Sequence, residues 1–87
     1  MKKVKVLFFS APWCGGCTKM KGKFYETCRE LGVDYKVLDV EEPEGLHKSI
    51  TYSVRNVPTL IFISNGREVG RATGNESYKK ISEYVGK

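Results

Sequence analysis

The run Val6–Phe9 is apolar at four consecutive positions, within a longer stretch Val4–Phe9 that is rich in branched and aromatic side chains. A strand with one face in water alternates apolar and polar residues, whereas a strand buried on both faces does not alternate. We therefore expect Val4–Phe9 to form the centre of a sheet covered on both sides. Because 87 residues suffice for one modest core, residues 1–87 are predicted to form a single domain.

The next segment has the pattern of a helix that packs on this sheet. Residues 15–31 carry an apolar stripe with spacings of four, four and three residues, formed by Met20, Phe24, Cys28 and Leu31. Gly32 suits the left-handed position that ends a helix. Val33–Val40 then reads as a second strand, so that strand, helix and strand form a right-handed unit with parallel strands.

The second half of the chain adds two strands and two helices. Pro43 suits the first turn of a short helix from about Glu44 to Tyr52, whose Leu46 and Ile50 we expect to point inward. Val57–Ile63 is predicted to form a third strand, in which Pro58 is the second residue.

A hairpin and a last helix are expected to complete the fold. Asn65–Gly66 is a strong hairpin signal, so Arg67–Thr73 should return antiparallel to the third strand. Gly74 ends that strand, and Asn75 is the expected N-cap of a helix that buries Tyr78, Ile81, Tyr84 and Val85. The predicted fold is α/β, in the order β-α-β-α-β-β-α, with a four-stranded mixed sheet and helices on both faces.

Cys14 and Cys17, at the junction of the first strand and the first helix, allow three interpretations. Structural zinc usually takes four ligands, and only Cys28 and His47 remain, neither with a suitable spacing. A structural disulfide that closes so small a loop would add little stability. A redox dithiol is favoured, because a helix N-terminus stabilises a thiolate and lowers the pKa of such cysteines to about 3.5–7.5.

Four segments of the chain together resemble the thioredoxin family. They are the active-site stretch Trp13–Cys17, the segment Tyr52–Thr59, the turn Asn65–Gly66, and Gly74. The resemblance implies a thioredoxin-like fold without the leading strand and helix of full-length thioredoxins, and a cis Val57–Pro58 bond. It further implies a nucleophilic Cys14, a resolving Cys17, an active-site loop of Gly15 and Gly16, and a substrate surface formed by Trp13, Val57, Pro58 and Gly74.

The chain departs from the family pattern at several positions. Gly16 stands where thioredoxins usually have proline, which should shift the pKa of Cys14 and the redox potential. Phe8 occupies the position of a buried acid, while Lys36 matches the usual lysine partner of that acid. Cys28 is extra, and we interpret it as a small core residue, with a regulatory thiol as the alternative.

Three functions remain open at this point. The first is a protein disulfide reductase that is recharged by a reductase such as NADPH-dependent thioredoxin reductase. By family analogy, this chain would then donate electrons to enzymes such as ribonucleotide reductase. A glutathione-dependent, glutaredoxin-like reductase would suit the short chain, but Gly74–Ser77 lacks the expected glutathione-binding turn. The third is a non-catalytic binding module with a basic net charge.

Composition bears on the expected location of the protein and on its expected partners. The odd number of three cysteines argues against a secreted disulfide scaffold, and we expect a cytoplasmic location. No apolar run approaches the length of a membrane span. The net charge of +5 is compatible with acidic protein partners, but a basic stripe with interleaved aromatic residues is missing. We expect a monomer with disulfide-containing partner proteins and without nucleic acid, membrane, cofactor or metal.

Overall fold

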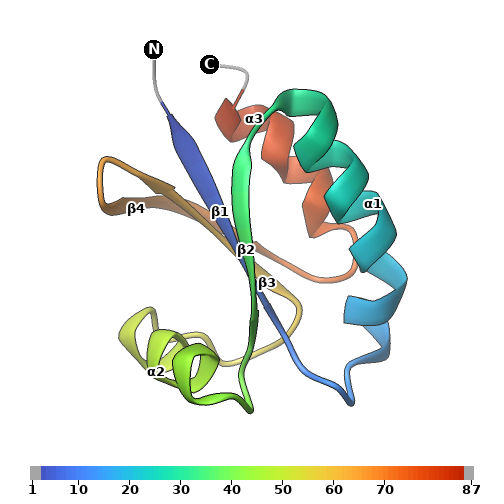
Figure 1. The fold of residues 1–87 in the computed structure, drawn as a ribbon, viewed down its shortest axis with the longest axis vertical. Helices are drawn as coiled ribbons and strands as arrows, with labels where there is room; N and C mark the ends of the chain where they lie inside the picture. Colours follow the sequence, from blue (N-terminus) through green and yellow to red (C-terminus); the bar gives the residue numbers. More distant parts are fainter. Residues whose placement is uncertain (1–2, 86–87) are drawn as a thin grey trace.

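The computed structural model describes residues 3–85, so the range 1–87 assigned to one domain extends two residues beyond the described part at each end. A four-stranded mixed sheet carries helices on both faces (Figure 1). The elements in chain order are β1 (Val4–Ser10), α1 (Gly15–Leu31), β2 (Asp34–Asp39), α2 (Pro43–Thr51), β3 (Thr59–Ser64), β4 (Arg67–Thr73), the 3₁₀-helix η1 (Ser77–Lys80) and α3 (Ile81–Val85).

The strands are ordered β2-β1-β3-β4, and the predicted four-stranded mixed sheet is confirmed. β1 runs parallel to β2 and antiparallel to β3, which pairs antiparallel with β4. Strand β1 therefore has a neighbour on each side, and Val6, Leu7, Phe8 and Phe9 are all buried, as the unbroken apolar run predicted. Strand β3 begins at Thr59 rather than Val57, since Pro58 has no N–H to donate to a ladder.

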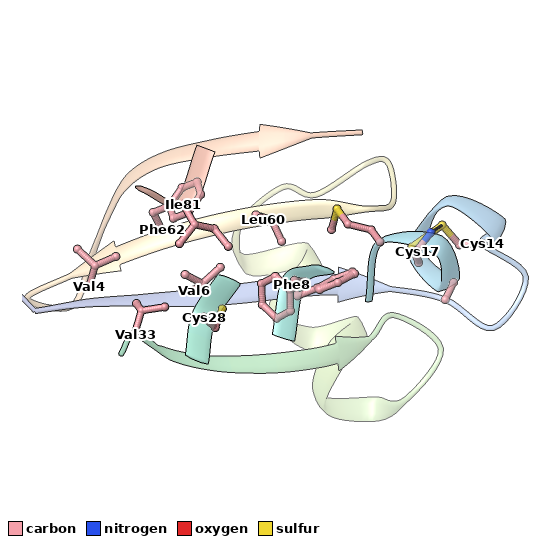
Figure 2. Close-up of a cluster of buried hydrophobic side chains, with 13 residues drawn as sticks. Val4, Val6, Phe8, Cys14, Cys17, Cys28, Val33, Leu60, Phe62 and Ile81 are labelled. Carbon is pink, nitrogen blue, oxygen red and sulfur yellow. Dashed lines mark hydrogen bonds between the residues drawn. A yellow bond between two sulfur atoms is a disulfide. The ribbon is translucent and has the colours of Figure 1, made fainter. Parts of the chain in front are cut away.

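Successive side chains of β1 enter two different cores, one on each face of the sheet. Val4, Val6 and Phe8 point toward α1 and α3, where the cluster in Figure 2 also contains Leu60, Phe62 and Ile81. Leu7 and Phe9 point to the opposite face, on the side of α2, together with Leu38 and Ile61. The dithiol segment joins the first of these clusters, because Cys14 and Cys17 belong to it.

The local turn signals are confirmed. Gly32 caps α1 in the left-handed region, with φ 64°. Asn65 and Gly66 have φ values of 55° and 78°, as the two central residues of the predicted hairpin turn require. In the predicted apolar stripe of α1, Met20, Phe24 and Cys28 are buried, whereas Leu31 at the end of the helix is exposed.

The expected inward face of α2 is wrong. Leu46 and Ile50 of α2 do not point inward: they are 51% and 71% exposed, and the helix buries Gly45 and Ser49 instead. Gly45 lies so close to the carbonyl of Asp39 that a Cβ atom there would collide with it, which turns the small side of α2 toward β2.

The last helix also differs from its prediction. Asn75 is not its N-cap, because a 3₁₀ turn over Ser77–Lys80 precedes α3. Ile81 is fully buried as expected, and the partly buried Tyr84 stacks on Phe62 with ring centroids 4.2 Å apart. Within residues 3–85, no helix has the length and apolar character needed to cross a membrane.

Candidate redox site

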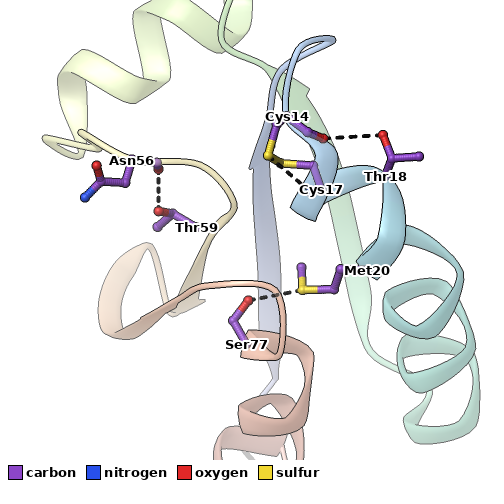
Figure 3. The surroundings of a disulfide bond; sticks show 7 residues. All are labelled: Cys14, Cys17, Thr18, Met20, Asn56, Thr59 and Ser77. Atoms are coloured by element: carbon purple, nitrogen blue, oxygen red, sulfur yellow. Dashed lines mark hydrogen bonds between the residues drawn. A yellow bond between two sulfur atoms is a disulfide. The ribbon is translucent and has the colours of Figure 1, made fainter.

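Cys14 and Cys17 form a disulfide at the start of α1, with their Cα atoms 5.3 Å apart (Figure 3). Strand β1 ends at Ser10, and a turn follows in which the N–H of Cys14 bonds the carbonyl of Ala11 at 3.1 Å. Cys14 is the N-cap of the helix, and its Sγ accepts a hydrogen bond from the N–H of Cys17 at 3.1 Å. The chain path therefore places one sulfur at the helix tip and the other one turn inside.

The two sulfurs differ in accessibility. Cys14 is 7% exposed, whereas Cys17 is 1% exposed and faces the core beneath it. The first turn of α1 contains no acidic residue, so the positive end of the helix dipole is not offset there. Lys19, Lys21 and Lys23 further along α1 are exposed, as a solvated face should be. Both cysteines are largely buried, and Cys14, at the tip of the helix, is the more exposed of the two.

Trp13 stands out from the surface next to Cys14, with 67% of the residue exposed. Its indole Nε1 donates a hydrogen bond to Oε2 of Glu41, 2.5 Å away. Glu41 follows β2, and the carboxyl ends of the parallel strands β1 and β2 lie at the same edge of the sheet. An exposed aromatic ring beside the dithiol is consistent with the contact surface expected for Trp13.

The loop before β3 and the loop after β4 meet beside the first turn of α1. The Val57–Pro58 peptide bond is cis, as the resemblance implied. Gly74, with φ 99°, donates its N–H to the carbonyl of Pro58 at 3.1 Å. A Cβ atom on Gly16 would lie 3.7 Å from Cδ of Pro58. The structure thus brings Pro58 and Gly74 together beside the first turn of α1.

The surroundings of Cys17 are apolar. Phe8 is fully buried in the same cluster as both cysteines, and it packs edge-to-face on Phe24 with a centroid distance of 4.7 Å. Lys36, the match to the usual lysine partner of the family's buried acid, lies one residue before the ladder partner of Phe8, which is Val37. Lys36 is exposed and forms an ion pair with Glu44. The alternation of β2 puts Val37, not Lys36, on the side of α1.

Cys28 and His47 take no part in this site. Cys28 is buried in the core of α1, as predicted for a small core residue, and burial raises the pKa of its thiol to about 11. His47 is exposed on α2, as expected. Within residues 3–85, no three His, Cys, Asp or Glu side chains gather in a way that could hold a metal ion.

Some residues near the dithiol were missed by the sequence analysis. A pocket of about 380 Å³ opens between Trp13, α2 and the loop before Pro58, and Leu46 and Arg55 line it together with Val57. Arg55 lies within Tyr52–Thr59, the segment that resembles thioredoxins, and its place three residues before Pro58 was the available signal. Glu41 could have been found from the shared edge of the two parallel strands.

Comparisons with known proteins agree with this geometry. Residues 1–87 match the family model described as thioredoxin. Thioredoxin of Bacillus subtilis (strain 168) is 29% identical over 79 residues, which are 91% of this chain and 76% of that protein. Bloodstream-specific protein 2 of Trypanosoma brucei brucei is 31% identical over 87 residues, which are 99% of this chain but only 17% of that longer protein.

A solved structure extends the likeness to three dimensions. The X-ray structure of Fasciola hepatica thioredoxin matches with a TM-score of 0.85 and 32% identity, covering 97% of this chain and 79% of that one. The fold, the sequence match and the linked Cys14–Cys17 pair at a helix N-terminus lead to one conclusion. The chain belongs to the thioredoxin family, and it is a thiol–disulfide oxidoreductase with a redox-active Cys14–Cys17 pair.

Proposed function

We propose that this chain reduces disulfides of other proteins by cycling Cys14 and Cys17 between dithiol and disulfide. The observation that carries the proposal is the placement of the two sulfurs: Cys14 is the N-cap of α1 and is 7% exposed, and Cys17 lies one turn inside the helix and is 1% exposed. A thiolate at a helix N-terminus is stabilised by the dipole and by N–H donors, which here include that of Cys17.

The first step forms a mixed disulfide. The Cys14 thiolate attacks one sulfur of the substrate disulfide, the substrate S–S bond breaks, and the second substrate sulfur leaves as a thiolate that takes up a proton. In this proposal an extended substrate segment pairs with the backbone of the partly buried Val57, next to Pro58. Trp13 and Gly74 flank the same place.

The second step releases the substrate. Cys17 loses its proton and attacks Sγ of Cys14, so the mixed disulfide breaks and the first substrate sulfur leaves as a thiol. The substrate has then gained two electrons and two protons, and Cys14–Cys17 is oxidised. Because Phe8 and other apolar side chains surround Cys17, its proton must pass to water, to a backbone group or to the departing substrate thiolate.

The reducing equivalents are proposed to come from NADPH through a thioredoxin reductase, with the chain acting as a monomer in the cytoplasm. Enzymes such as ribonucleotide reductase, which end each turnover with an oxidised cysteine pair, are the proposed acceptors. Membership of the thioredoxin family supports this assignment over a glutathione-dependent one.

Insulin reduction tests the proposal. The protein is assayed in parallel with NADPH plus thioredoxin reductase and with glutathione plus glutathione reductase and NADPH. We expect turnover with the first system, loss of turnover in Cys14→Ser, and normal turnover in the control Cys28→Ala. Turnover only with glutathione would overturn the assignment in favour of the glutaredoxin-like alternative, and turnover with neither would reject protein disulfide reduction.

A further inference from the structure

The pocket beside Trp13 is lined mainly by apolar side chains. Its volume is about 380 Å³, and the apolar part of its lining is Trp13, Val40, Leu46, Val54 and Val57. Ile50 lies four residues after Leu46, therefore on the same face of α2, and is also exposed. Large exposed apolar side chains that gather beside a functional group mark a contact surface.

A cation without a partner stands in the same pocket. Arg55 lines it and is exposed, and it forms no ion pair with any carboxylate of residues 3–85. By contrast, Arg71 on β4 is bonded to Glu68, and Glu41 near the pocket is occupied by the indole of Trp13. A guanidinium is always charged and bonds carboxylates in a fixed geometry, so Arg55 is free to take one from a partner.

We propose that this pocket makes the protein selective for disulfides whose flanking residues include an aliphatic or aromatic side chain and a carboxylate. The apolar side chain enters between Trp13 and Leu46, and the carboxylate pairs with Arg55. The inference rests on the proposed reduction of protein disulfides and adds the class of protein disulfide that is preferred. The net charge of +5 attracts acidic partners from a distance, but it does not distinguish one flanking position from another.

Peptides with two cysteines in a disulfide loop provide the test. Three peptides differ in the two residues next to one of the cysteines: Leu-Glu, Leu-Lys or Ser-Ser. Each peptide is made in two forms, with these two residues either before or after that cysteine. The value of kcat/KM for reduction is measured for the wild type, Arg55→Glu and Leu46→Ser. Arg67→Glu and Leu31→Ser are matched controls: Arg67 is in the hairpin at the far end of β3, and the exposed Leu31 ends α1.

The wild type should favour the Leu-Glu peptide over the Leu-Lys peptide by about fivefold at low salt, since an exposed ion pair is modestly favourable and the reversed charge repels. Arg55→Glu should invert this ratio, whereas Arg67→Glu, with the same change of net charge, should leave it unchanged. Leu46→Ser should lower kcat/KM for the leucine peptides relative to the Ser-Ser peptide, and Leu31→Ser should not.

The three peptides together separate selectivity from reduction. Failure to reduce any of them would count against protein disulfide reduction itself. Reduction of all three peptides at equal rates by the wild type and Arg55→Glu would overturn the selectivity and leave the reduction standing. A preference for Glu that Arg67→Glu diminishes as much as Arg55→Glu would assign it to net charge, which also overturns the role of Arg55.

Discussion

The indole Nε1 of Trp13 donates a hydrogen bond to Oε2 of Glu41 at 2.5 Å, although the two residues are 28 positions apart in the sequence. Trp13 precedes α1, and Glu41 follows β2. The bond restrains an aromatic ring that is otherwise exposed to solvent beside the disulfide. Glu41 therefore positions the ring of Trp13, which belongs to the proposed substrate surface.

Glu41→Ala should free the indole ring of Trp13. Because Trp13 is the one tryptophan of the sequence, its fluorescence anisotropy reports on this ring alone, and we expect it to fall. The value of kcat/KM for insulin reduction should fall about threefold, in line with the loss of one hydrogen bond worth about 0.5–1.5 kcal/mol. Glu41→Gln retains an acceptor oxygen and is the control; equal anisotropy in all three proteins would contradict the restraint.

Cys17→Ser should accumulate a covalent complex with a disulfide substrate. Attack by Cys14 still forms the mixed disulfide, but the sulfur that would break it is gone. Non-reducing electrophoresis and intact-mass analysis after mixing with oxidised substrate give the yield of the adduct. Cys14→Ser should form little adduct, since Cys17 is buried. A larger yield from Cys14→Ser than from Cys17→Ser would reverse the roles of the two cysteines.

Two glycine-to-alanine substitutions should have opposite effects on stability. Gly45→Ala places a Cβ atom against the carbonyl of Asp39, so α2 must move and the free energy of unfolding should fall by about 1–3 kcal/mol. Gly22→Ala lies within α1 with no atom near the new Cβ, and it should raise stability by up to about 1 kcal/mol through helix propensity. Urea unfolding of the oxidised protein measures both, and changes of the same sign would refute the close approach of α2 to β2.

The buried thiol of Cys28 should make stability fall with pH in the alkaline range. Its pKa is raised from 9.0 to about 11, so between these values the unfolded chain has lost the proton while the folded protein keeps it. The contribution of this thiol is complete below pH 9 and declines by up to about 1.4 kcal/mol per pH unit above it.

Urea unfolding between pH 8 and 11 measures this decline. The Cys14→Ser/Cys17→Ser background with reductant removes other thiol titrations, and adding Cys28→Ala provides the control without the group. The stability advantage of the protein with Cys28 should shrink as the pH rises from 9 to 11. Parallel curves for the two proteins would show that Cys28 ionises equally in the folded and unfolded states.

The sequence by itself determined the features that depend on nearby residues. The unbroken run Val6–Phe9 specified a strand with neighbours on both sides, because a run without alternation can be buried only in the middle of a layered sheet. Gly32 and Asn65–Gly66 specified the end of α1 and the hairpin, because few residues adopt positive φ. Cys14 and Cys17, one helical turn apart, needed no distant contact to form a pair.

Only the tertiary structure decided how the separate elements face one another. Leu46 and Ile50 look like the inner face of α2, but the contact of Gly45 with the Asp39 carbonyl turns them outward, and Leu46 thereby lines the pocket with Arg55. Register likewise sets Val37 beside Phe8 and leaves Lys36 exposed. These outcomes depend on where strand ends and helices meet, and the physical cause is close packing between segments far apart in the chain, which no local pattern encodes.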